Sequence, residues 1–182
     1  MKKMNKPLFL ILDKVFSDAT IDTLYGHFRD SKAWKFIGEG NDNSNWRKFT
    51  YLLKKKNKID NILFFKANEI LKNNGLQDST KLIRAYASGN IYGTVHDIHK
   101  DDGATNYNEI ITIMFYLNKV WDMSYGGETI FLSPDQQEIL NSVIPKPGRA
   151  VLFDGAIPHG AREVGRQCIE LRMVVSFKYE VI

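Results

Sequence analysis

The side chains best suited to chemistry lie in the second half of the chain. His99 and Asp101 are separated by one residue, and in an extended segment such side chains point the same way. A third metal-binding side chain, His159, follows much later, within Ile157-Pro158-His159-Gly160. Two histidines and one carboxylate on one face leave coordination positions open, an arrangement that suits a catalytic Fe(II) ion. The pattern predicts a metal site.

Neighbouring residues compete for these roles. His96 lies three residues before His99, but only His99 has a carboxylate two positions on, so His99 is preferred. Asp102 is the rival of Asp101, and one step along a strand would turn its side chain to the other face. A bare His-x-Asp pair is also common in surface turns, so the order of the surrounding elements has to support the metal site.

Residues 1–80 are expected to form a mostly helical support. The run from Leu8 to Leu12 predicts an opening strand, and Ser17 or Asp18 can cap a helix that ends near Arg29. A second helix is expected over about 60–73, ended by Gly75, with a loop over 38–45 between the two helices. The side chains expected to be buried on these helices are Ile21, Leu24, Tyr25, Phe28, Ile62, Leu63, Phe65, Ile70 and Leu71.

Residues 81–182 are expected to form a β-sheet core. Segments rich in β-branched and aromatic residues are separated by clusters of Gly, Asn, Asp and Pro. The expected strands are 82–87, 109–118, 129–132, 149–153 and 170–181. Helices followed by strands predict an α+β fold, with the helices packed on one face of a mostly antiparallel sheet or barrel. Residues 135–142 look like an inserted helical or loop element near the mouth of the site.

The last expected strand has two distinct faces, because side chains alternate with a period of two. One face carries only apolar residues, which are Leu171, Met173, Val175, Phe177 and Tyr179. The other face carries Arg172, Val174, Ser176 and Lys178. The first face predicts contact with the helices, and the second predicts a lumen that accepts a cation and a hydroxyl group.

The overall composition indicates a globular protein with one domain over residues 1–182, since hydrophobic residues make up 43% and charged residues 25%. The single cysteine, Cys168, predicts a reducing, cytoplasmic location. The apolar run at 8–12 is too short to cross a membrane. Lys54-Lys55-Lys56 has no interleaved aromatic residues, so nucleic acid is not expected as a partner. The net charge of +4 favours an anionic substrate.

Several longer motifs lie between the two predicted metal-binding segments, His99–Asp101 and His159. The segment from Ile113 to Asp122 contains Tyr-Leu-Asn followed by Trp121, and Gly126-Gly127-Glu128-Thr129 follows it. The segment 146–153 then leads to Pro158-His159. Together they resemble the prolyl-hydroxylase branch of the Fe(II)- and 2-oxoglutarate-dependent oxygenases, over roughly residues 81–179. The resemblance implies a double-stranded β-helix, the jelly-roll or cupin-like barrel of that superfamily.

The resemblance also implies roles for individual residues. His99, Asp101 and His159 would bind the iron, and Arg172 would bind the distal carboxylate of 2-oxoglutarate. Arginine suits a carboxylate because its guanidinium presents a fixed fork of donors. By the same resemblance, Tyr116 would donate a hydrogen bond to that carboxylate, and Ser176 would contribute a hydroxyl to the pocket. Tyr86 is a further candidate for contact with the co-substrate, although an aromatic residue there also suits a core position.

The implied chemistry needs Fe(II), 2-oxoglutarate and O2, with ascorbate as a candidate reductant, and it releases succinate and CO2. Related halogenases replace the ligand carboxylate with a small residue, so Asp101 predicts hydroxylation or desaturation instead of halogenation. The substrate is expected to be a small molecule or a short peptide, with a prolyl residue among the candidates. The sequence does not define the oligomeric state.

Three other interpretations are compatible with parts of the pattern. A cupin-like isomerase or hydrolase using Zn(II), Mn(II) or Ni(II) would keep the metal ligands but would not need Arg172, Tyr116 and Ser176. A non-catalytic barrel that only binds a ligand would need no metal. A nucleic-acid demethylase of the same superfamily tends to carry a second arginine late on the final strand, where this chain has Lys178.

Overall fold

The computed structural model describes residues 7–37, 48–94 and 97–182. The expected loop at 38–45 and His96 therefore lie outside the described residues. The strands are β1 (Phe9–Leu12), β2 (Lys35–Ile37), β3 (Lys48–Leu52), β4 (Thr80–Asn90), β5 (Ile110–Tyr116), β6 (Thr129–Leu132), β7 (Ile139–Val143), β8 (Ala150–Asp154), β9 (His159–Ala161) and β10 (Arg172–Val181). The helices are α1 (Asp18–Arg29) and α2 (Lys58–Asn73), with short 3-10 turns η1 (Gln77–Ser79), η2 (Asp101–Gly103) and η3 (Met123–Tyr125).

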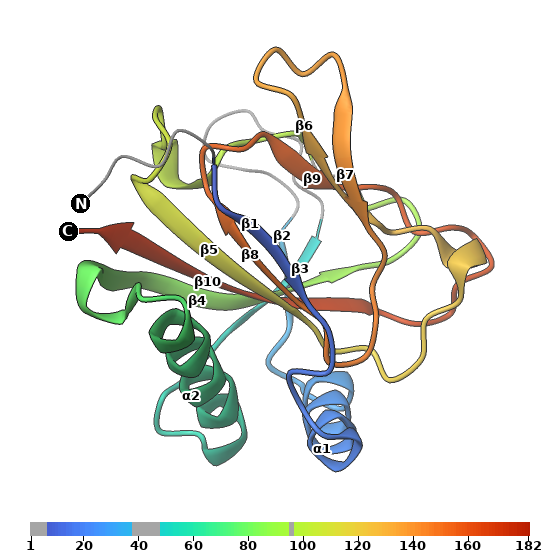
Figure 1. The fold of residues 1–182 in the computed structure, drawn as a ribbon. Coiled ribbons are helices and arrows are strands. Elements are labelled where there is room, and N and C mark those ends of the chain that lie inside the picture. Colours follow the sequence, from blue (N-terminus) through green and yellow to red (C-terminus); the bar gives the residue numbers. More distant parts are fainter. Residues whose placement is uncertain (1–6, 38–47, 95–96) are drawn as a thin grey trace.

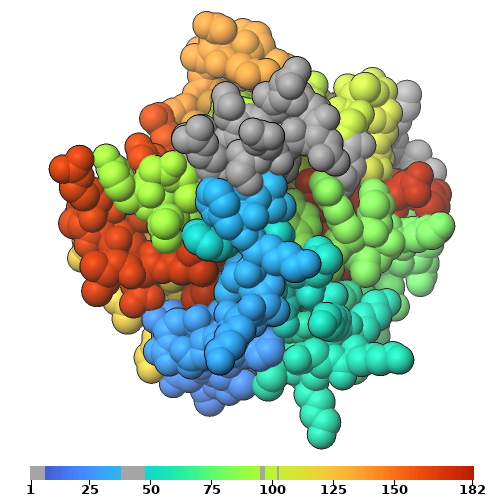
Figure 2. Space-filling view, turned by 180° about the vertical axis from the view of Figure 1, so that it is seen from behind, coloured from blue at the N-terminus to red at the C-terminus, as the bar shows by residue number. Residues whose placement is uncertain are grey.

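The strands form two antiparallel sheets. The larger sheet has seven strands in the order β1-β8-β5-β10-β4-β3-β2, and the smaller has three in the order β7-β6-β9. Both helices lie against one face of the larger sheet, and the smaller sheet lies on its opposite side (Figure 1). The same two helices occupy the bottom of the molecule when it is seen from behind, α1 in blue and α2 in teal (Figure 2). The predicted α+β arrangement, with helices on one sheet, is confirmed.

The helices begin at side-chain caps and bury one face each. Ser17 accepts a hydrogen bond from the backbone N–H of Thr20 at the start of α1, and Asn57 caps α2 in the same way. The core between the helices and the larger sheet is one cluster that includes Leu24, Phe28, Leu63, Ala67, Ile113, Phe115, Val175 and Phe177. Among the described residues, no helix is long and apolar enough to cross a membrane.

The N-terminal region contains two strands that the sequence interpretation missed. β2 and β3 pair with each other, and β3 extends the larger sheet through β4. The expectation of a mostly helical support over residues 1–80 was therefore wrong in this part. Both strands are short; β2 is the edge strand and pairs with β3, which pairs with β4, and this pairing stabilises them more than local propensity does. Phe65 was also expected to be buried, but it is 69% exposed, and its neighbour Phe64 packs into the core instead.

The segment 135–142 is not a helical insertion. β7 covers Ile139–Val143 and pairs with β6, after a tight turn in which the N–H of Gln136 donates to the carbonyl of Ser133. The segment is therefore a β-hairpin. The first four residues of β7, Ile139 to Ser142, are all exposed, so the strand lacks the alternation of buried and exposed residues by which a strand is predicted.

The alternation expected along the last strand is confirmed. Met173, Val175, Phe177 and Tyr179 lie in the core beneath the helices. Arg172, Val174, Ser176 and Lys178 line a cavity on the other side of the sheet. Both faces of this strand are buried, so it separates the apolar core from the polar interior where the site lies.

A candidate metal and co-substrate site

The three predicted metal ligands come together through backbone pairing of two distant segments. The N–H of His99 donates to the carbonyl of His159 at 3.0 Å, and the N–H of His159 returns a bond to His99 at 2.9 Å. Asp101 follows at the start of η2, where its N–H donates to the carbonyl of Gly155 at 2.8 Å. One candidate ligand atom from each side chain lies within 4.8 Å of the other two.

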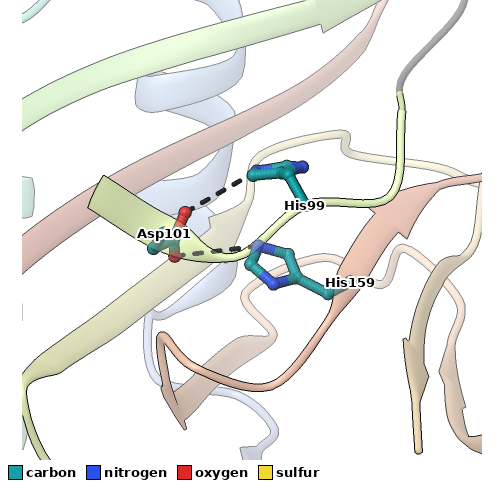
Figure 3. Close-up of side chains that lie close together, drawn as sticks. All are labelled: His99, Asp101 and His159. Carbon is teal, nitrogen blue, oxygen red and sulfur yellow. Dashed lines mark ion pairs between the residues drawn. The ribbon is translucent and has the colours of Figure 1, made fainter. Parts of the chain in front are cut away.

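The orientation of both imidazoles suits a metal ion. Nδ1 of His99 lies 3.0 Å from the carbonyl of Asp97, and Nδ1 of His159 lies 2.8 Å from that of Ile157. A carbonyl only accepts, so each Nδ1 carries the proton and each Nε2 presents a lone pair. These Nε2 atoms lie 3.6 Å and 3.7 Å from the carboxylate oxygens of Asp101, as the dashed lines in Figure 3 show.

The arrangement therefore gathers three electron-pair donors around one point. When the proton of each ring is on Nδ1, no proton lies between the two Nε2 atoms and the carboxylate, and lone pairs that face one another at this distance repel. A divalent cation between them removes this repulsion, so the donor set fits Fe(II). The chemistry of His99, Asp101 and His159 is therefore compatible with a bound Fe(II) ion.

Burial and neighbouring charges set the protonation of these groups. Burial lowers the pKa of His159 to about 4, so its ring is neutral at physiological pH and ready to coordinate. Burial alone would raise the pKa of Asp101, but the ammonium group of Lys178, which forms an ion pair with the carboxylate, helps to hold that pKa well below its ordinary value. The carboxylate is therefore ionised.

The carboxylate of Asp101 has two further neighbours. Thr112 on β5 donates its hydroxyl proton to Oδ2 at 2.6 Å. The ammonium group of Lys178 on β10 forms an ion pair with Oδ1, and both partners are almost fully buried. Among the described residues, Oδ1 forms no further hydrogen bond. The threonine thus fixes the plane of the carboxylate, while the lysine balances its charge.

The triad opens into a cavity between the two sheets, with an open volume of about 490 Å³ that includes space continuous with solvent. Inner-face residues from β4, β5 and β10 form much of its wall. Its lining includes Lys48, Tyr86, Ser88, Asn90, Thr112, Met114, Thr129, Arg172, Val174, Ser176 and Lys178, besides the three candidate ligands.

Arg172 is held rigidly inside this cavity. The residue is only 3% exposed, and its Nε donates to the carbonyl of Gly127. Its terminal nitrogens donate to the hydroxyl of Thr129 at 2.8 Å and, more weakly, to the side-chain oxygen of Asn90 at 3.4 Å. Burial lowers the pKa of Arg172, against the opposing influence of Tyr116 and Glu128. A guanidinium fixed in this way is a preorganised receptor for a carboxylate.

The motif around residues 116–129 explains how Arg172 is positioned. The side chain of Asn118 accepts a hydrogen bond from the N–H of Met173 and donates one to the carbonyl of Leu171, both at 2.8 Å. It therefore fixes the start of β10. Gly127 has a φ of +68°, and a Cβ there would lie 3.0 Å from Cδ of Arg172. Only glycine fits both that conformation and that contact.

The remaining predicted residues lie at different depths. Ser176 and Tyr86 line the cavity and face each other in the β10–β4 register. Tyr116 is fully buried, donates its hydroxyl proton to Thr129 at 2.8 Å, and has its ring 5.6 Å from the guanidinium carbon of Arg172. Tyr116 is not among the described residues that line the cavity, and it contacts the site through Thr129 and Arg172.

Sequence reasoning missed several cavity residues. Thr112 and Met114 share the parity of Tyr116 on β5, so the period-two rule could have identified them. Thr129 is the last residue of the Gly-Gly-Glu-Thr motif, which the sequence singled out without assigning the threonine a role. Lys48 carried no such signal, because its strand was not expected.

Comparison with known proteins agrees with this geometry. Residues 83–178, more than half of the chain, match the family described as the 2OG-Fe(II) oxygenase superfamily. The chain belongs to this superfamily, whose members use Fe(II), 2-oxoglutarate and O2. A comparison with curated protein sequences gives no match.

Solved structures confirm the double-stranded β-helix fold. A Pseudomonas putida prolyl-4-hydroxylase has a TM-score of 0.74 at 16% identity, covering 96% of this chain and 92% of that one. A Trichoplax adhaerens prolyl hydroxylase, solved with a peptide of the hypoxia inducible factor oxygen degradation domain, has a TM-score of 0.73 at 15% identity, covering 95% and 83%. The epimerase SnoN from nogalamycin biosynthesis has a TM-score of 0.67 at 11% identity, covering 95% and 77%. The chain is therefore a dioxygenase whose fold alone does not define its substrate.

Proposed function

We propose that this oxygenase hydroxylates an aliphatic C–H bond of a small-molecule or peptidyl substrate. In this proposal His99, Asp101 and His159 bind Fe(II), and Arg172 binds the distal carboxylate of 2-oxoglutarate. The observation that carries the proposal is the convergence of two imidazole lone pairs and one ionised carboxylate beside a buried, preorganised guanidinium.

Each protein group has a separate task. The carbonyls of Asp97 and Ile157 fix the tautomers of the two histidines, and Thr112 orients the carboxylate of Asp101. Thr129 keeps the guanidinium of Arg172 in place. Fe(II) and 2-oxoglutarate, when bound, would supply the oxidising chemistry together with O2, one oxygen atom entering succinate as CO2 is released and the other entering the C–H bond of the substrate. Because Asp101 occupies the position that a halide would need, we propose hydroxylation as the outcome.

The substrate is the open part of the proposal. The Trichoplax neighbour was solved with a peptide, and the Pseudomonas neighbour is a prolyl-4-hydroxylase, so a prolyl peptide is the first candidate to test. SnoN, on the same fold, is an epimerase, so small molecules belong in the same screen. We further propose that the chain works as a single domain in a reducing compartment, in keeping with its free Cys168.

The direct test is anaerobic titration of Fe(II) into the metal-free protein, with and without 2-oxoglutarate. Bidentate binding of the co-substrate to Fe(II) produces a weak visible charge-transfer band. We expect the band only when both are present. A folded, iron-loaded protein that gives no band with 2-oxoglutarate would contradict the proposal.

Two histidine variants test which of His96 and His99 binds the metal. His99→Ala should abolish the band, because it removes one of the three donors. His96→Ala is the matched control and should leave the band largely intact. The opposite result would make His96 the ligand and refute the assignment of His99.

A further inference from the structure

The turn that joins β8 to β9 is buried along its whole length. Residues 154–158 are all buried, although connecting segments usually lie at the surface, where water satisfies their backbone groups. The N–H of Ile157 donates to the carbonyl of Asp154 at 3.0 Å, which closes a tight turn. We call residues 154–157 the β8–β9 turn. Its backbone groups need partners inside the protein, and two of these partners belong to the candidate metal ligands.

Two carbonyl groups of the β8–β9 turn hold two of the three candidate ligands. The carbonyl of Gly155 accepts a hydrogen bond from the backbone N–H of Asp101 at 2.8 Å. The carbonyl of Ile157 lies 2.8 Å from Nδ1 of His159, so it accepts the proton that leaves Nε2 free for a metal. One short segment thus sets both the position of the carboxylate ligand and the tautomer of a histidine ligand.

The contact between the turn and Asp101 is closely packed. A Cβ at Gly155 would lie 3.0 Å from Cβ of Asp101 and 2.8 Å from Cγ2 of Ile110, which is too close for an ordinary side chain. The N–H of Gly155 also donates to the carbonyl of Ile110 at 2.8 Å. Since close-packed interiors transmit small displacements, a shift of the turn would move Asp101 as well.

The side chain of Asp154 keeps the turn in this shape. Its Oδ1 accepts a hydrogen bond from the N–H of Ala156 at 3.0 Å, the contact with the chain two residues on that is typical of an aspartate in a turn. Its Oδ2 accepts one from the N–H of Asn108 at 2.6 Å. Asn108 has a φ of +64°, which is uncommon for a residue with a side chain. Asp154 therefore also ties the turn to the segment that leads into β5.

A carboxyl group at this depth is unfavourable for packing alone. Asp154 is fully buried, and burial raises its pKa, although the N–H groups of Ala156 and Asn108 oppose the rise. An apolar side chain would avoid the cost of burying the carboxyl group, but it would leave these two N–H groups without their acceptors. The residue is thus suited to fixing the backbone on both sides of the turn.

We propose that Asp154 is a positioning residue for the metal site, acting through the β8–β9 turn on Asp101 and His159. This inference rests on the proposed function, because it takes Asp101 and His159 as metal ligands. Both carboxyl oxygens of Asp154 accept backbone N–H groups, so the residue acts on the ligands through the turn. Metal affinity therefore depends on a fourth side chain besides the three ligands.

Asp154→Asn tests this role with little change in size. One carboxyl oxygen becomes an NH2 group, which donates and cannot accept the N–H of Asn108 or Ala156. We expect Mn(II) affinity, measured by electron paramagnetic resonance, to fall by about tenfold or more, as is usual when a group that orients a metal ligand is lost. In the metal-free variant, nitrogen NMR of the imidazole rings should show both tautomers of His159 in place of the Nδ1–H form alone.

Asp60→Asn is the matched control for a general loss of stability. Asp60 is also fully buried and accepts hydrogen bonds from the N–H of Lys54 at 2.8 Å and from the hydroxyl of Tyr51 at 3.1 Å. It is not among the described residues that line the metal cavity. Both variants should unfold at lower urea concentration, but Asp60→Asn should bind Mn(II) as the unmodified protein does. Unchanged Mn(II) affinity in Asp154→Asn, or equal weakening in both variants, would overturn the inference.

A measurement on the unmodified protein covers the case in which Asp154→Asn does not fold. Hydrogen exchange compares the N–H of Ala156, which is bonded to Asp154, with the N–H of Lys54, which is bonded to Asp60. Zn(II) should slow exchange by a larger factor at Ala156, because a metal fixes the ligands that the turn holds. Equal factors at the two positions would overturn the inference.

The two proposals fail in different ways. If the unmodified protein with Fe(II) and 2-oxoglutarate gives no charge-transfer band, the proposed function fails. If the band forms but Asp154→Asn binds Mn(II) as tightly as the unmodified protein, only the positioning role of Asp154 fails.

Discussion

The ammonium group of Lys178 forms an ion pair with Oδ1 of Asp101, the carboxylate oxygen that also faces Nε2 of His99. In the metal-free protein the lysine thus provides the positive charge nearest to this buried carboxylate. A divalent ion bound to Asp101 would take over that role and would also be repelled by the ammonium group. Lys178 therefore stabilises the metal-free state at the expense of the metal-bound one.

Lys178→Met should have opposite effects on stability and on metal affinity. Removing one partner of a buried ion pair costs about 3–5 kcal/mol, so the metal-free variant should unfold at lower denaturant concentration. Metal affinity should rise by about tenfold or more, because a competing cation has gone. Mn(II) titration followed by electron paramagnetic resonance measures the affinity, and Lys81→Met is the control. Unchanged or weaker Mn(II) binding would show that the lysine does not compete.

Arg172→Met should weaken 2-oxoglutarate binding without affecting the metal. The loss of a bidentate, charge-assisted contact corresponds to about 2 kcal/mol or more, which is roughly a thirtyfold weaker affinity. Fe(II) titration measures the metal, and the dependence of the charge-transfer band on 2-oxoglutarate concentration measures the co-substrate. Arg166→Met, at an exposed position, is the matched control. Equal affinity for 2-oxoglutarate in the Arg172 variant would place the carboxylate receptor elsewhere.

Substitutions of Tyr116 and Thr129 should weaken 2-oxoglutarate binding to different extents. The hydroxyl of Thr129 accepts hydrogen bonds from both Tyr116 and Arg172, so Thr129→Val leaves two buried donors unsatisfied, at about 1–3 kcal/mol each. Tyr116→Phe removes a single donor, typically worth about 1 kcal/mol. We expect the threonine variant to show the larger loss of 2-oxoglutarate affinity. A tyrosine variant as impaired as Arg172→Met would show that the phenol touches the co-substrate directly.

The stability of the metal-free protein should fall on mild acidification because of His159. Its folded-state pKa of about 4 lies below the ordinary value of 6.5. In that window the unfolded state binds more protons, so folding stability decreases as pH falls. Between pH 6.5 and 5 the loss should be about 1.5 kcal/mol. Urea unfolding with a chelator present measures it, and His159→Gln should show a clearly flatter pH dependence. An identical pH dependence in the variant would exclude His159 as the source.

Much of the interior was predictable because β10 is long and strictly alternating. Its period of two separated the apolar residues beneath the helices from Arg172, Ser176 and Lys178, and the structure has the same division. The ion pair between Lys178 and Asp101 was not predictable. It depends on how the 3-10 turn after His99 lies against β10, which is a tertiary relationship between segments far apart in the chain.

The edge of the larger sheet was harder to predict for a similar reason. β2 and β3 are short, and they join the sheet through β4, which comes from later in the chain. Local propensity carries little information about strands that exist through such non-local pairing. Lys48, which lies on β3, was therefore not predicted to line the cavity.

The reciprocal backbone bridge between His99 and His159 links metal affinity to folding. The two histidines belong to distant parts of the sequence, so an unfolded chain rarely brings all three donors together. An ion that binds the folded state alone adds about 2.7 kcal/mol to stability at a hundredfold excess over its dissociation constant. Melting curves recorded across a series of divalent ions should therefore rank their affinities without any knowledge of the substrate.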